Sequence, residues 1–358
     1  MNNFVTLRVN GREWGGWTSV KIAAGIERLA RDFNVQITRQ WPGETGSVPL
    51  QPRVKKGELV EVLIGDDLVI TGWIEAMPVR YDARSVSFGI TGRSKTCDLI
   101  DCVAAPTQFS GRTLAQIAKK LAEPFDVAVL DEGAPTSPLQ GIQADHGETV
   151  REVLAKLLAQ QQALAYDDPK GQLVIGAIGS THAVTALVFG ENILLCDTEQ
   201  SIRDRFSDYQ VSGQRAGGNV DFGEATISAI RASTKDEQIT RYRPYAIQQT
   251  GNATGATCKS RCEFEALQRA ARTEETTYTV QGWRQGDGSL WKPNQRVIVF
   301  DPILGFNNRE MVIAEVTYSL DENGTTSEIR VGPEDAYLPE PNKPGKRPKR
   351  KKAVEDDF

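Results

Sequence analysis

Over the first hundred residues, apolar and polar positions alternate with the period of two that is typical of β-strands. The clearest case is Phe33–Thr38, where Phe33, Val35 and Ile37 would face one way and the polar residues between them the other. Glycine and proline separate the candidate strands, as in small barrels and sandwiches. We predict strands at Phe4–Val9, Trp17–Ala24, Phe33–Thr38, Leu59–Ile64, Leu68–Met77 and Ser85–Gly92, and a short helix at Ile26–Arg31.

The period of the apolar residues changes after about residue 100. In Thr113–Phe125 and in Thr149–Gln162, apolar residues recur three and four positions apart, which predicts two helices with one buried face each. Short apolar runs follow each helix and predict strands at Val127–Leu130, Ala163–Tyr166 and Gln172–Ile178. This order indicates a small α+β domain whose core is formed by the Leu and Val stripes.

Residues 181–338 return to strand-like segments. We predict strands at Asp208–Gly213, Tyr278–Gly282, Arg296–Phe300, Glu310–Leu320 and Ser327–Val331. A polar stretch from Ala216 to Gly255 and a helix predicted at Lys259–Arg272 interrupt this region. We therefore expect an insertion at about 216–275.

These segments define the expected fold class and domains. The fold is α+β and mainly β, with two similar small β-barrel domains, a middle α+β domain and an inserted α/β segment. The tail is rich in Pro, Lys and Gly and has almost no apolar residues, so we expect it to be flexible. The predicted parts are a first β-barrel domain at 1–100, the α+β domain at 101–180, a second β-barrel domain at 181–338 and the charged tail at 339–358.

An internal repeat would relate the two β regions. When Asp82 is aligned with Asp321, apolar positions coincide on both sides of the alignment, although few residues are identical. The matched pairs are Ile74 with Ile313, Met77 with Val316 and Val79 with Tyr318. A true duplication and a chance match between two β-meanders are both compatible with this pattern.

Charge is distributed unevenly along the 358 residues. The formal net charge is -5, but residues 339–358 hold seven basic and four acidic side chains, so the rest of the chain carries -8. The basic block is compatible with contact to nucleic acid or a membrane surface, although a solvated terminal tail is the commoner explanation. No apolar run approaches the roughly 18 residues of a membrane helix, and no secretory signal is visible.

Candidate chemistry is sparse. The two histidines, His146 and His182, leave little material for a metal centre or a histidine-based catalytic site. Ser180 lies close to His182 in the chain, but no nucleophile-elbow motif surrounds it. The five cysteines lack the spacing of zinc sites, so we predict free thiols in a reducing compartment: Cys97, Cys102, Cys196, Cys258 and Cys262.

Two short motifs resemble a known family. The first has the pattern G-R-S-x-x-x-D-L-x-D and consists of Gly92, Arg93, Ser94, Asp98, Leu99 and Asp101. It is similar to the segment that closes the first barrel in baseplate hub proteins of contractile phage tails. The second resembles the middle domain of the same family, where the first three residues open a helix and the last two open a strand: Gly147, Glu148, Thr149, Gly171 and Leu173. Apart from the tail, the whole chain is similar to the hub proteins of Mu-like phages and prophages.

This resemblance implies a structural protein without catalytic residues, cofactor or metal. It implies a homotrimer, in which two related barrels per subunit build a pseudo-sixfold ring that joins the sixfold tail tube to the threefold central spike. The expected partners are the spike, the tube, other baseplate proteins, and DNA that passes through the lumen without specific binding. The expected location is the tail baseplate of the virion, assembled in the cytoplasm of the host bacterium.

Two other functions remain open at this point. A peptidoglycan-degrading tail-tip enzyme would need convergent carboxylates or a Ser/His pair in a cleft. A carbohydrate-binding module would need exposed aromatic platforms. The tryptophans lie in or beside the β regions, where a core or interface position is the more common one: Trp14, Trp17, Trp41, Trp73, Trp283 and Trp291.

Overall fold

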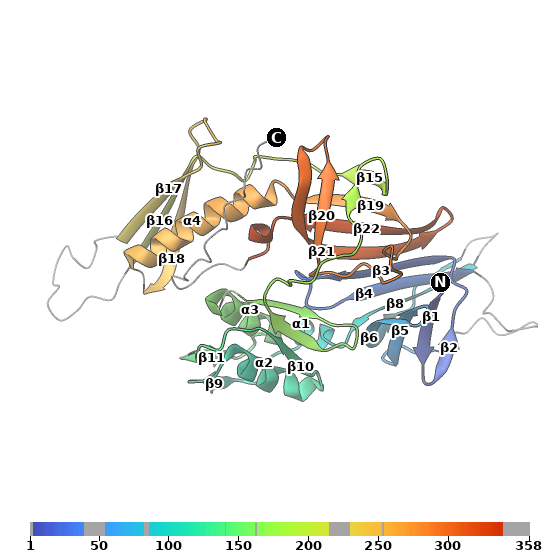
Figure 1. Cartoon of the computed structure of the whole chain (residues 1–358). Coiled ribbons are helices and arrows are strands. Elements are labelled where there is room, and N and C mark those ends of the chain that lie inside the picture. The colour runs from blue at the N-terminus through green and yellow to red at the C-terminus, as the bar shows by residue number, and fades with distance from the viewer. Residues whose placement is uncertain are drawn as a thin grey trace, which may run out of the picture. The chain divides into compact units, whose positions relative to one another are not determined.

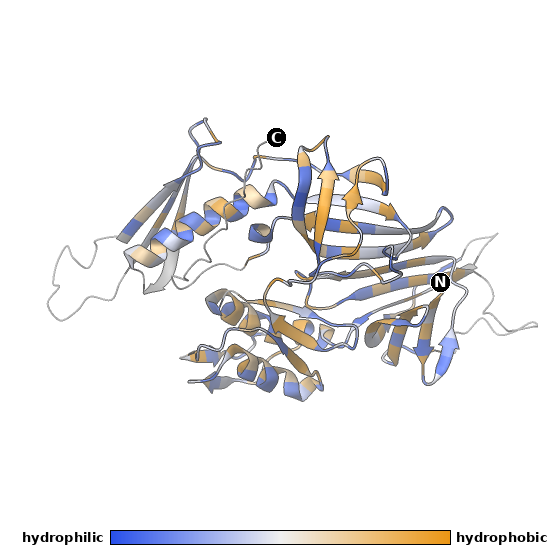
Figure 2. Ribbon diagram, viewed as in Figure 1, coloured by the Kyte–Doolittle hydropathy of each residue, from blue (hydrophilic) through white to orange (hydrophobic). Residues whose placement is uncertain are grey.

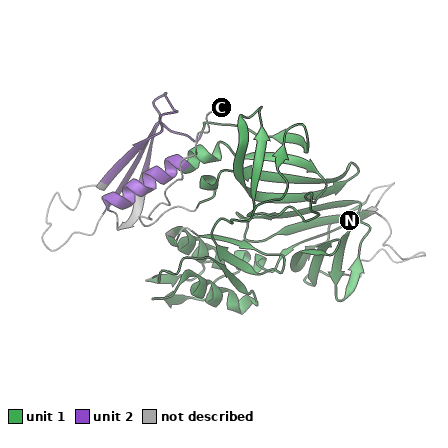
Figure 3. Cartoon of the chain, viewed as in Figure 1, with its two compact units in different colours: residues 1–203, 268–339 green, residues 204–267, 340–358 purple. Residues whose placement is uncertain are grey.

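The computed structural model describes residues 3–38, 54–81, 86–139, 141–161, 163–214, 230–252 and 254–338. The chain divides into two compact units, one of residues 1–203 and 268–339, the other of residues 204–267 and 340–358 (Figure 3). Strands dominate over helices, so the predicted α+β, mainly β fold class is confirmed. The closure of the β regions into barrels stays a prediction, and the predicted charged tail and Trp41 lie outside the described residues.

The first β region contains all six predicted strands and two short additional ones. In space the order is β3-β4-β8-β6-β5-β1-β2, with β7 paired to β8. Phe33, Val35 and Ile37 are buried while Asn34 and Gln36 are exposed, which confirms the predicted alternation. The strands are β1 (Val5–Val9), β2 (Arg12–Trp14), β3 (Ser19–Gly25), β4 (Asp32–Thr38), β5 (Leu59–Ile64), β6 (Asp67–Ala76), β7 (Val79–Tyr81) and β8 (Val86–Ser94).

The helix predicted at Ile26–Arg31 is wrong. These residues form the turn between β3 and β4. The backbone N–H of Ile26 donates to the Ala314 carbonyl at 2.8 Å, and that of Arg31 donates to Asp167 Oδ2 at 2.9 Å. Contacts with residues far along the chain therefore take the donors that a helix would have used.

The second β region has the spatial order β15-β19-β22-β21, with β20 paired to β21 and β14 paired to β20. Its tryptophans Trp283 and Trp291 are buried, as predicted. The strands are β14 (Leu187–Val188), β15 (Ile193–Asp197), β19 (Thr276–Gln281), β20 (Arg296–Asp301), β21 (Phe306–Asp321) and β22 (Gly324–Gly332).

Strands β3 and β21 join the two regions into one sheet of 14 strands (Figure 1). They pair antiparallel, from Val20 opposite Leu320 to Gly25 opposite Glu315. Arg284 adds a second link, because it donates to Asp67 Oδ2 at 2.6 Å and to the Ile64 carbonyl at 3.0 Å on the β5–β6 hairpin. Apolar residues of both regions consequently share one core, and Figure 2 shows them alternating with polar residues along the strands.

The ladders of the two regions match in register. Ile74 and Ile313, which are 239 residues apart, pair with Gly92 and Val331, which are also 239 residues apart. The same shift relates Val79 opposite Phe88 to Tyr318 opposite Ser327. The alignment drawn from the sequence therefore joins positions with the same place in the two ladders.

Irregularities in the ladders recur at matched places. The β6–β8 pairing shifts between Ile74 and Ala76, and the β21–β22 pairing shifts between Ile313 and Glu315. A further shift follows Val62 in the β5–β6 pairing and Val299 in the β20–β21 pairing. Because bulges are position-specific features of a fold, their coincidence favours duplication over a chance match.

The middle region contains both predicted helices. The helix predicted at Thr113–Phe125 ends at Ala122 instead of Phe125. Pro124 lies in the 3₁₀ turn that follows, where it cannot continue the α-helix. Its core is formed by the apolar stripes, as predicted. The elements are α1 (Cys97–Asp101), β9 (Thr107–Phe109), α2 (Leu114–Ala122), β10 (Val129–Glu132), β11 (Ile142–Ala144), α3 (Val150–Gln161), β12 (Leu164–Asp167) and β13 (Leu173–Gly176).

The second unit is a three-stranded sheet with a helix. Strand β16 (Asp208–Gln214) lies between β17 (Ile230–Lys235) and β18 (Pro244–Asn252), and α4 (Gly255–Arg272) follows. Strands β17 and β18 lie in the stretch that the sequence analysis described only as polar. Their described side chains bury little apolar surface, so the sequence carried no strand pattern there. Residues 216–229 of the predicted insertion lie outside the described residues. No described helix combines the length and the apolar composition that crossing a membrane requires.

Strands β6 and β8 approach closely at two glycines, which gives a stability prediction. A Cβ on Gly72 would lie 1.9 Å from the Arg93 carbonyl oxygen, so Gly72→Ala must displace backbone and should cost about 3 kcal/mol of unfolding free energy. Gly15→Ala is the control, because its Cβ would be 3.5 Å from the nearest atom. Urea denaturation of both variants measures the difference, and equal midpoints would contradict this packing.

Candidate assembly site

The junction between the first β region and the middle region carries several residues of the first motif. Arg93, in β8, donates from Nε to Glu75 Oε2 at 2.7 Å and from Nη2 to Asp101 Oδ2 at 2.5 Å. Glu75 is the residue at the β6 bulge, and Asp101 ends helix α1. The hydrogen bond from Arg93 lowers the pKa of Asp101. The motif thus brings Arg93 and Asp101 together, and their pairing fastens α1 to the sheet.

The first residue of this motif, Gly92, has no room for a side chain. Its ideal Cβ would lie 2.0 Å from the Trp73 carbonyl oxygen and 2.7 Å from the Phe33 ring. A larger residue at this position would therefore separate β8 from β6, which carries Arg93's partner Glu75.

A buried ion pair lies beside Ser94. Arg31 Nε is 3.3 Å from Asp167 Oδ1, and Arg31 also donates from Nη1 to the Val69 carbonyl at 3.0 Å. The Ser94 hydroxyl accepts from the Arg31 backbone N–H at 3.2 Å and lies 2.8 Å from the Thr96 hydroxyl. Burial raises the pKa of the Asp167 carboxyl, and the positive charge of Arg31 opposes that rise. This network connects the β3–β4 turn and strands β6 and β8 of the first region to β12 of the middle region.

The turn after β12 packs on the same junction. Gly171 has φ +73°, and a Cβ there would lie 2.6 Å from the Thr71 carbonyl oxygen, so a side chain at this position would collide with β6. Asp168 Oδ1 accepts from backbone N–H groups within the turn. Leu173 then begins β13, is fully buried and pairs with Val129.

The first three residues of the second motif form the start of helix α3. Gly147 has φ +92° and supplies the turn. Thr149 caps the helix, because Glu152 N–H donates to Thr149 Oγ1 at 3.2 Å and Thr149 N–H donates to Glu152 Oε2 at 2.8 Å. Glu148 forms an ion pair with Lys156, whose hydrogen bond lowers the pKa of Glu148.

The remaining motif residues are structural as well. Leu99 is fully buried in the core of the middle region. Asp98 occupies the first turn of α1 and contacts the Cys97 thiol at 3.9 Å. The motif residues therefore lie at two places, the β8–α1 junction and the start of α3, and they do not converge on one cleft.

Both histidines are exposed, and two of the cysteines, Cys258 and Cys262, share one small buried cluster. His182 Nε2 is 3.1 Å from Glu310 Oε2 on an exposed surface, and His146 is exposed in a turn. All five cysteines are free, as predicted, and burial raises the pKa of Cys97 to about 12, which disfavours a reactive thiolate. Within the described ranges, no three metal-ligating side chains gather.

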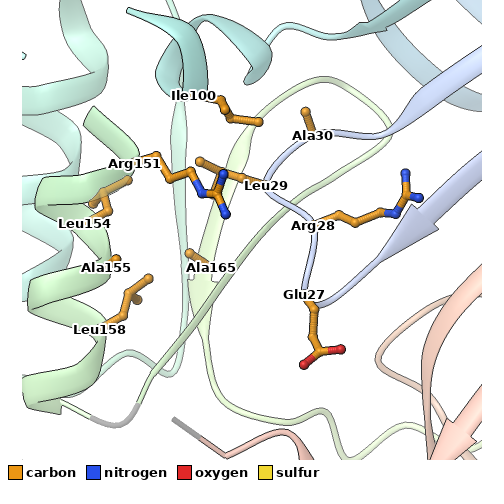
Figure 4. A pocket seen from close by; sticks show the side chains of 10 residues that line it. All are labelled: Glu27, Arg28, Leu29, Ala30, Ile100, Arg151, Leu154, Ala155, Leu158 and Ala165. Carbon is orange, nitrogen blue, oxygen red and sulfur yellow. The ribbon is translucent and has the colours of Figure 1, made fainter. Parts of the chain in front are cut away.

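A shallow cavity of about 320 Å³ lies between the β3–β4 turn and helix α3 (Figure 4). Arg28 and Arg151 contribute charge, while Leu29, Leu154 and Leu158 form its apolar part. No motif residue and no nucleophilic side chain line this cavity, so its lining residues do not form a catalytic site.

Comparison with known proteins identifies the architecture. Residues 4–94 match the N-terminal domain of Mu phage baseplate assembly protein GpP-like proteins, residues 96–177 the second domain of gp44-like baseplate hub proteins, and residues 254–340 the fourth domain of GpP. The chain is 34% identical over 347 residues to the baseplate hub protein gp44 of Escherichia phage Mu, covering 94% of this chain and 90% of the phage protein. The chain belongs to the Mu gp44-like family of baseplate hub proteins.

Solved structures agree with this family. The tail protein of prophage MuSo2 from Shewanella oneidensis has a TM-score of 0.84 and 31% identity, covering 94% of this chain and all of that one. A tail protein from Neisseria meningitidis has a TM-score of 0.78 and 26% identity, covering 95% and 99%. A type VI secretion component of E. coli, 9% identical with a TM-score of 0.54 over 96% of this chain and 79% of that one, shares the fold alone.

Family membership confirms the predicted resemblance and the prediction of a structural tail protein rather than an enzyme. The chain is a baseplate hub protein of the phage tail. The roles of the individual motif residues stay predictions, which the contacts above make concrete.

The sequence interpretation missed Arg31 and misplaced Asp167. Both were assigned to a predicted helix or turn, where charged residues are normally solvated. One sequence signal pointed to this pair, namely the position of Asp167 directly after the apolar strand Ala163–Tyr166. Nothing in the sequence marked Arg31. The two residues are 136 positions apart, and the pair forms only because the intervening chain folds back on the first region.

Removal of Arg31 should destabilise the junction strongly. Arg31→Met leaves the Asp167 carboxylate buried without its cation, so we expect a loss of about 3–5 kcal/mol in unfolding free energy. Lys120→Met is the control, because the Lys120–Glu123 pair is exposed to solvent and contributes little to stability. Chemical denaturation measures both variants.

The pH dependence gives an independent check on the same variant. With Arg31 absent, the folded-state pKa of Asp167 rises further above its unfolded value, so the folded state binds the proton more tightly. The contribution of Asp167 to the stability of Arg31→Met should therefore increase as the pH falls from the folded-state pKa towards the lower unfolded-state pKa. A variant whose stability is unaffected by acid, or equals wild type at pH 7, would contradict a buried pair.

Proposed function

We propose that three copies of the chain form a closed ring in which six β regions alternate around one axis. The two regions of each copy have matched ladders and matched bulges, so they can occupy similar places in a pseudo-sixfold arrangement. Such a ring would join the sixfold tail tube to the threefold central spike, because it presents six similar faces and three identical subunits. The matched ladders are the observation that carries this proposal.

The parts without a repeat would serve the threefold side. Following the predicted division, the middle domain at 101–180 and the insertion at about 216–275 occur once per chain, and hence three times per ring. One relative by fold is a chain of the Francisella PdpA–VgrG complex, at 8% identity and a TM-score of 0.54. Contact with a spike and with other baseplate proteins is in keeping with a hub in the tail baseplate, assembled in the host cytoplasm.

The lumen of the ring would be negatively charged. Outside the tail the chain carries a net charge of -8, and negative charge on the lumen wall would repel phosphates, so DNA would pass without specific binding. A positively charged lumen in an assembled structure would contradict this part of the proposal.

The two alternatives have less support. A carbohydrate-binding module would expose aromatic platforms, whereas Trp17, Trp283 and Trp291 are buried. A peptidoglycan-degrading enzyme would show lytic activity in a zymogram, and its detection would favour that alternative. The contacts described above hold domains together and assemble no acid–base pair within a cleft of the described residues.

Sedimentation tests the ring. Three chains of 39.3 kDa give about 118 kDa, so the purified protein should sediment as a single species of that mass at micromolar concentration. Rings with six lobes should appear in negative-stain micrographs. A species that stays at the mass of one chain across the accessible concentrations would refute the trimer.

A further inference from the structure

Strands β15 and β7 each have one edge without a neighbouring strand in the described chain. Strand β15 ends the spatial order of the large sheet, where it pairs only with β19. Strand β7 pairs only with β8. Both edges carry exposed apolar side chains: Val79 at 53%, Tyr81 at 78%, and Leu194 and Leu195 at 58% each. Exposed apolar edges are usually covered, because they invite pairing with another strand.

The matched ladders indicate which strand covers each of these two open edges. The shift of 239 residues that superimposes β6 and β8 on β21 and β22 places Val79, Arg80 and Tyr81 where Tyr318, Ser319 and Leu320 lie. In the second region, that edge of β21 is occupied by β3. In the first region, the equivalent edge of β7 is open.

The same comparison assigns β15 to the place of β3. Strand β3 pairs with β4 through Val20 opposite Val35, and β15 pairs with β19 through Cys196 opposite Tyr278. Strands β4 and β19 are themselves equivalent in their pairing with β8 and β22. The free edge of β15 is therefore the edge with which β3 contacts β21.

We propose that β15 of one subunit pairs antiparallel with β7 of the next, repeating between chains the β3–β21 pairing found within the chain. Transfer of the register from Leu320 opposite Val20 places Tyr81 opposite Cys196. Transfer from Ser319 opposite Lys21 places Arg80 opposite Asp197. This inference rests on the proposed ring, for which it names the contact that closes each of the three joints.

Side-chain chemistry agrees with this register. Arg80 and Asp197 have opposite charges, both are exposed, and neither has an ion-pair partner in the described part of the chain. Directly opposite charges on one face of a strand pair stabilise the pairing. Leu320 and Cys196 both pack on the shared core, so Tyr81, at the position equivalent to Leu320, would cover an apolar surface next to Cys196.

Pro78 does not obstruct the pairing. Its carbonyl accepts from Gly89 N–H at 2.7 Å, so the backbone groups of this position point towards β8. The missing N–H of proline is thus on the occupied side, and the backbone groups of Val79 and Tyr81 point to the open edge.

A single cysteine substitution tests the register. Residues directly opposite in an antiparallel pair have Cα atoms about 5.5 Å apart or less, which suits a disulfide. Under mild oxidation, Tyr81→Cys should cross-link to Cys196 of the next subunit and give a covalent trimer on a non-reducing gel. Tyr81→Cys combined with Cys196→Ser removes the intended partner, and Arg80→Cys presents its thiol on the other face, so neither control should form the trimer.

The outcomes separate this proposal from the ring itself. Wild-type protein that sediments at about 118 kDa, with Tyr81→Cys failing to cross-link, would overturn the β15–β7 pairing and leave the ring standing. A monomeric wild type would overturn both. Covalent trimer that persists after Cys196→Ser would also overturn the proposed register, because another thiol would then be the partner.

Charge reversal provides a second measurement that needs no oxidation. Arg80→Asp and Asp197→Arg each place like charges opposite one another, and each should weaken trimer association by at least about fivefold per joint. The double variant Arg80→Asp with Asp197→Arg restores opposite charges and should recover most of the association. Single variants that assemble like wild type, or a double variant weaker than both, would contradict the pairing.

Discussion

The antiparallel contact between β3 and β21 is the constraint on which the rest of the molecule depends. It turns two β regions that are distant in sequence into one sheet with one core, and it fixes the rotation that carries the first region onto the second. Backbone hydrogen bonds between the two strands fix their pairing, and these bonds depend little on the identity of the side chains. The few identities between the repeats are therefore no obstacle to their equivalence.

Most of the regular elements could be predicted from periodicity, because burial on one face leaves a pattern in the sequence. The strand at Phe33–Thr38 and the two helices of the middle region are examples. The errors have physical reasons. Strands β17 and β18 bury few apolar side chains, and the turn at Ile26–Arg31 is fixed by partners more than 100 residues away.

The motif residues could be found from the sequence, but their contacts could not. The resemblance to the hub family singled out Arg93 and Asp101 in one segment, and the structure adds that they form an ion pair. Asp167 is different, because its importance comes from burial against Arg31, a residue without any sequence signal. Positions fixed by local geometry, such as Gly147 and Thr149, are predictable, whereas pairs that bridge separate domains require coordinates.

The attachment of the second unit has a structural consequence. The chain leaves the sheet at the end of β15 and returns at the start of β19, and these strands are direct neighbours, with Asp197 opposite Thr277. Whatever polypeptide is spliced between them starts and finishes at almost the same point. A longer or shorter polypeptide between β15 and β19 would therefore leave the hydrogen-bonding pattern of the sheet unchanged.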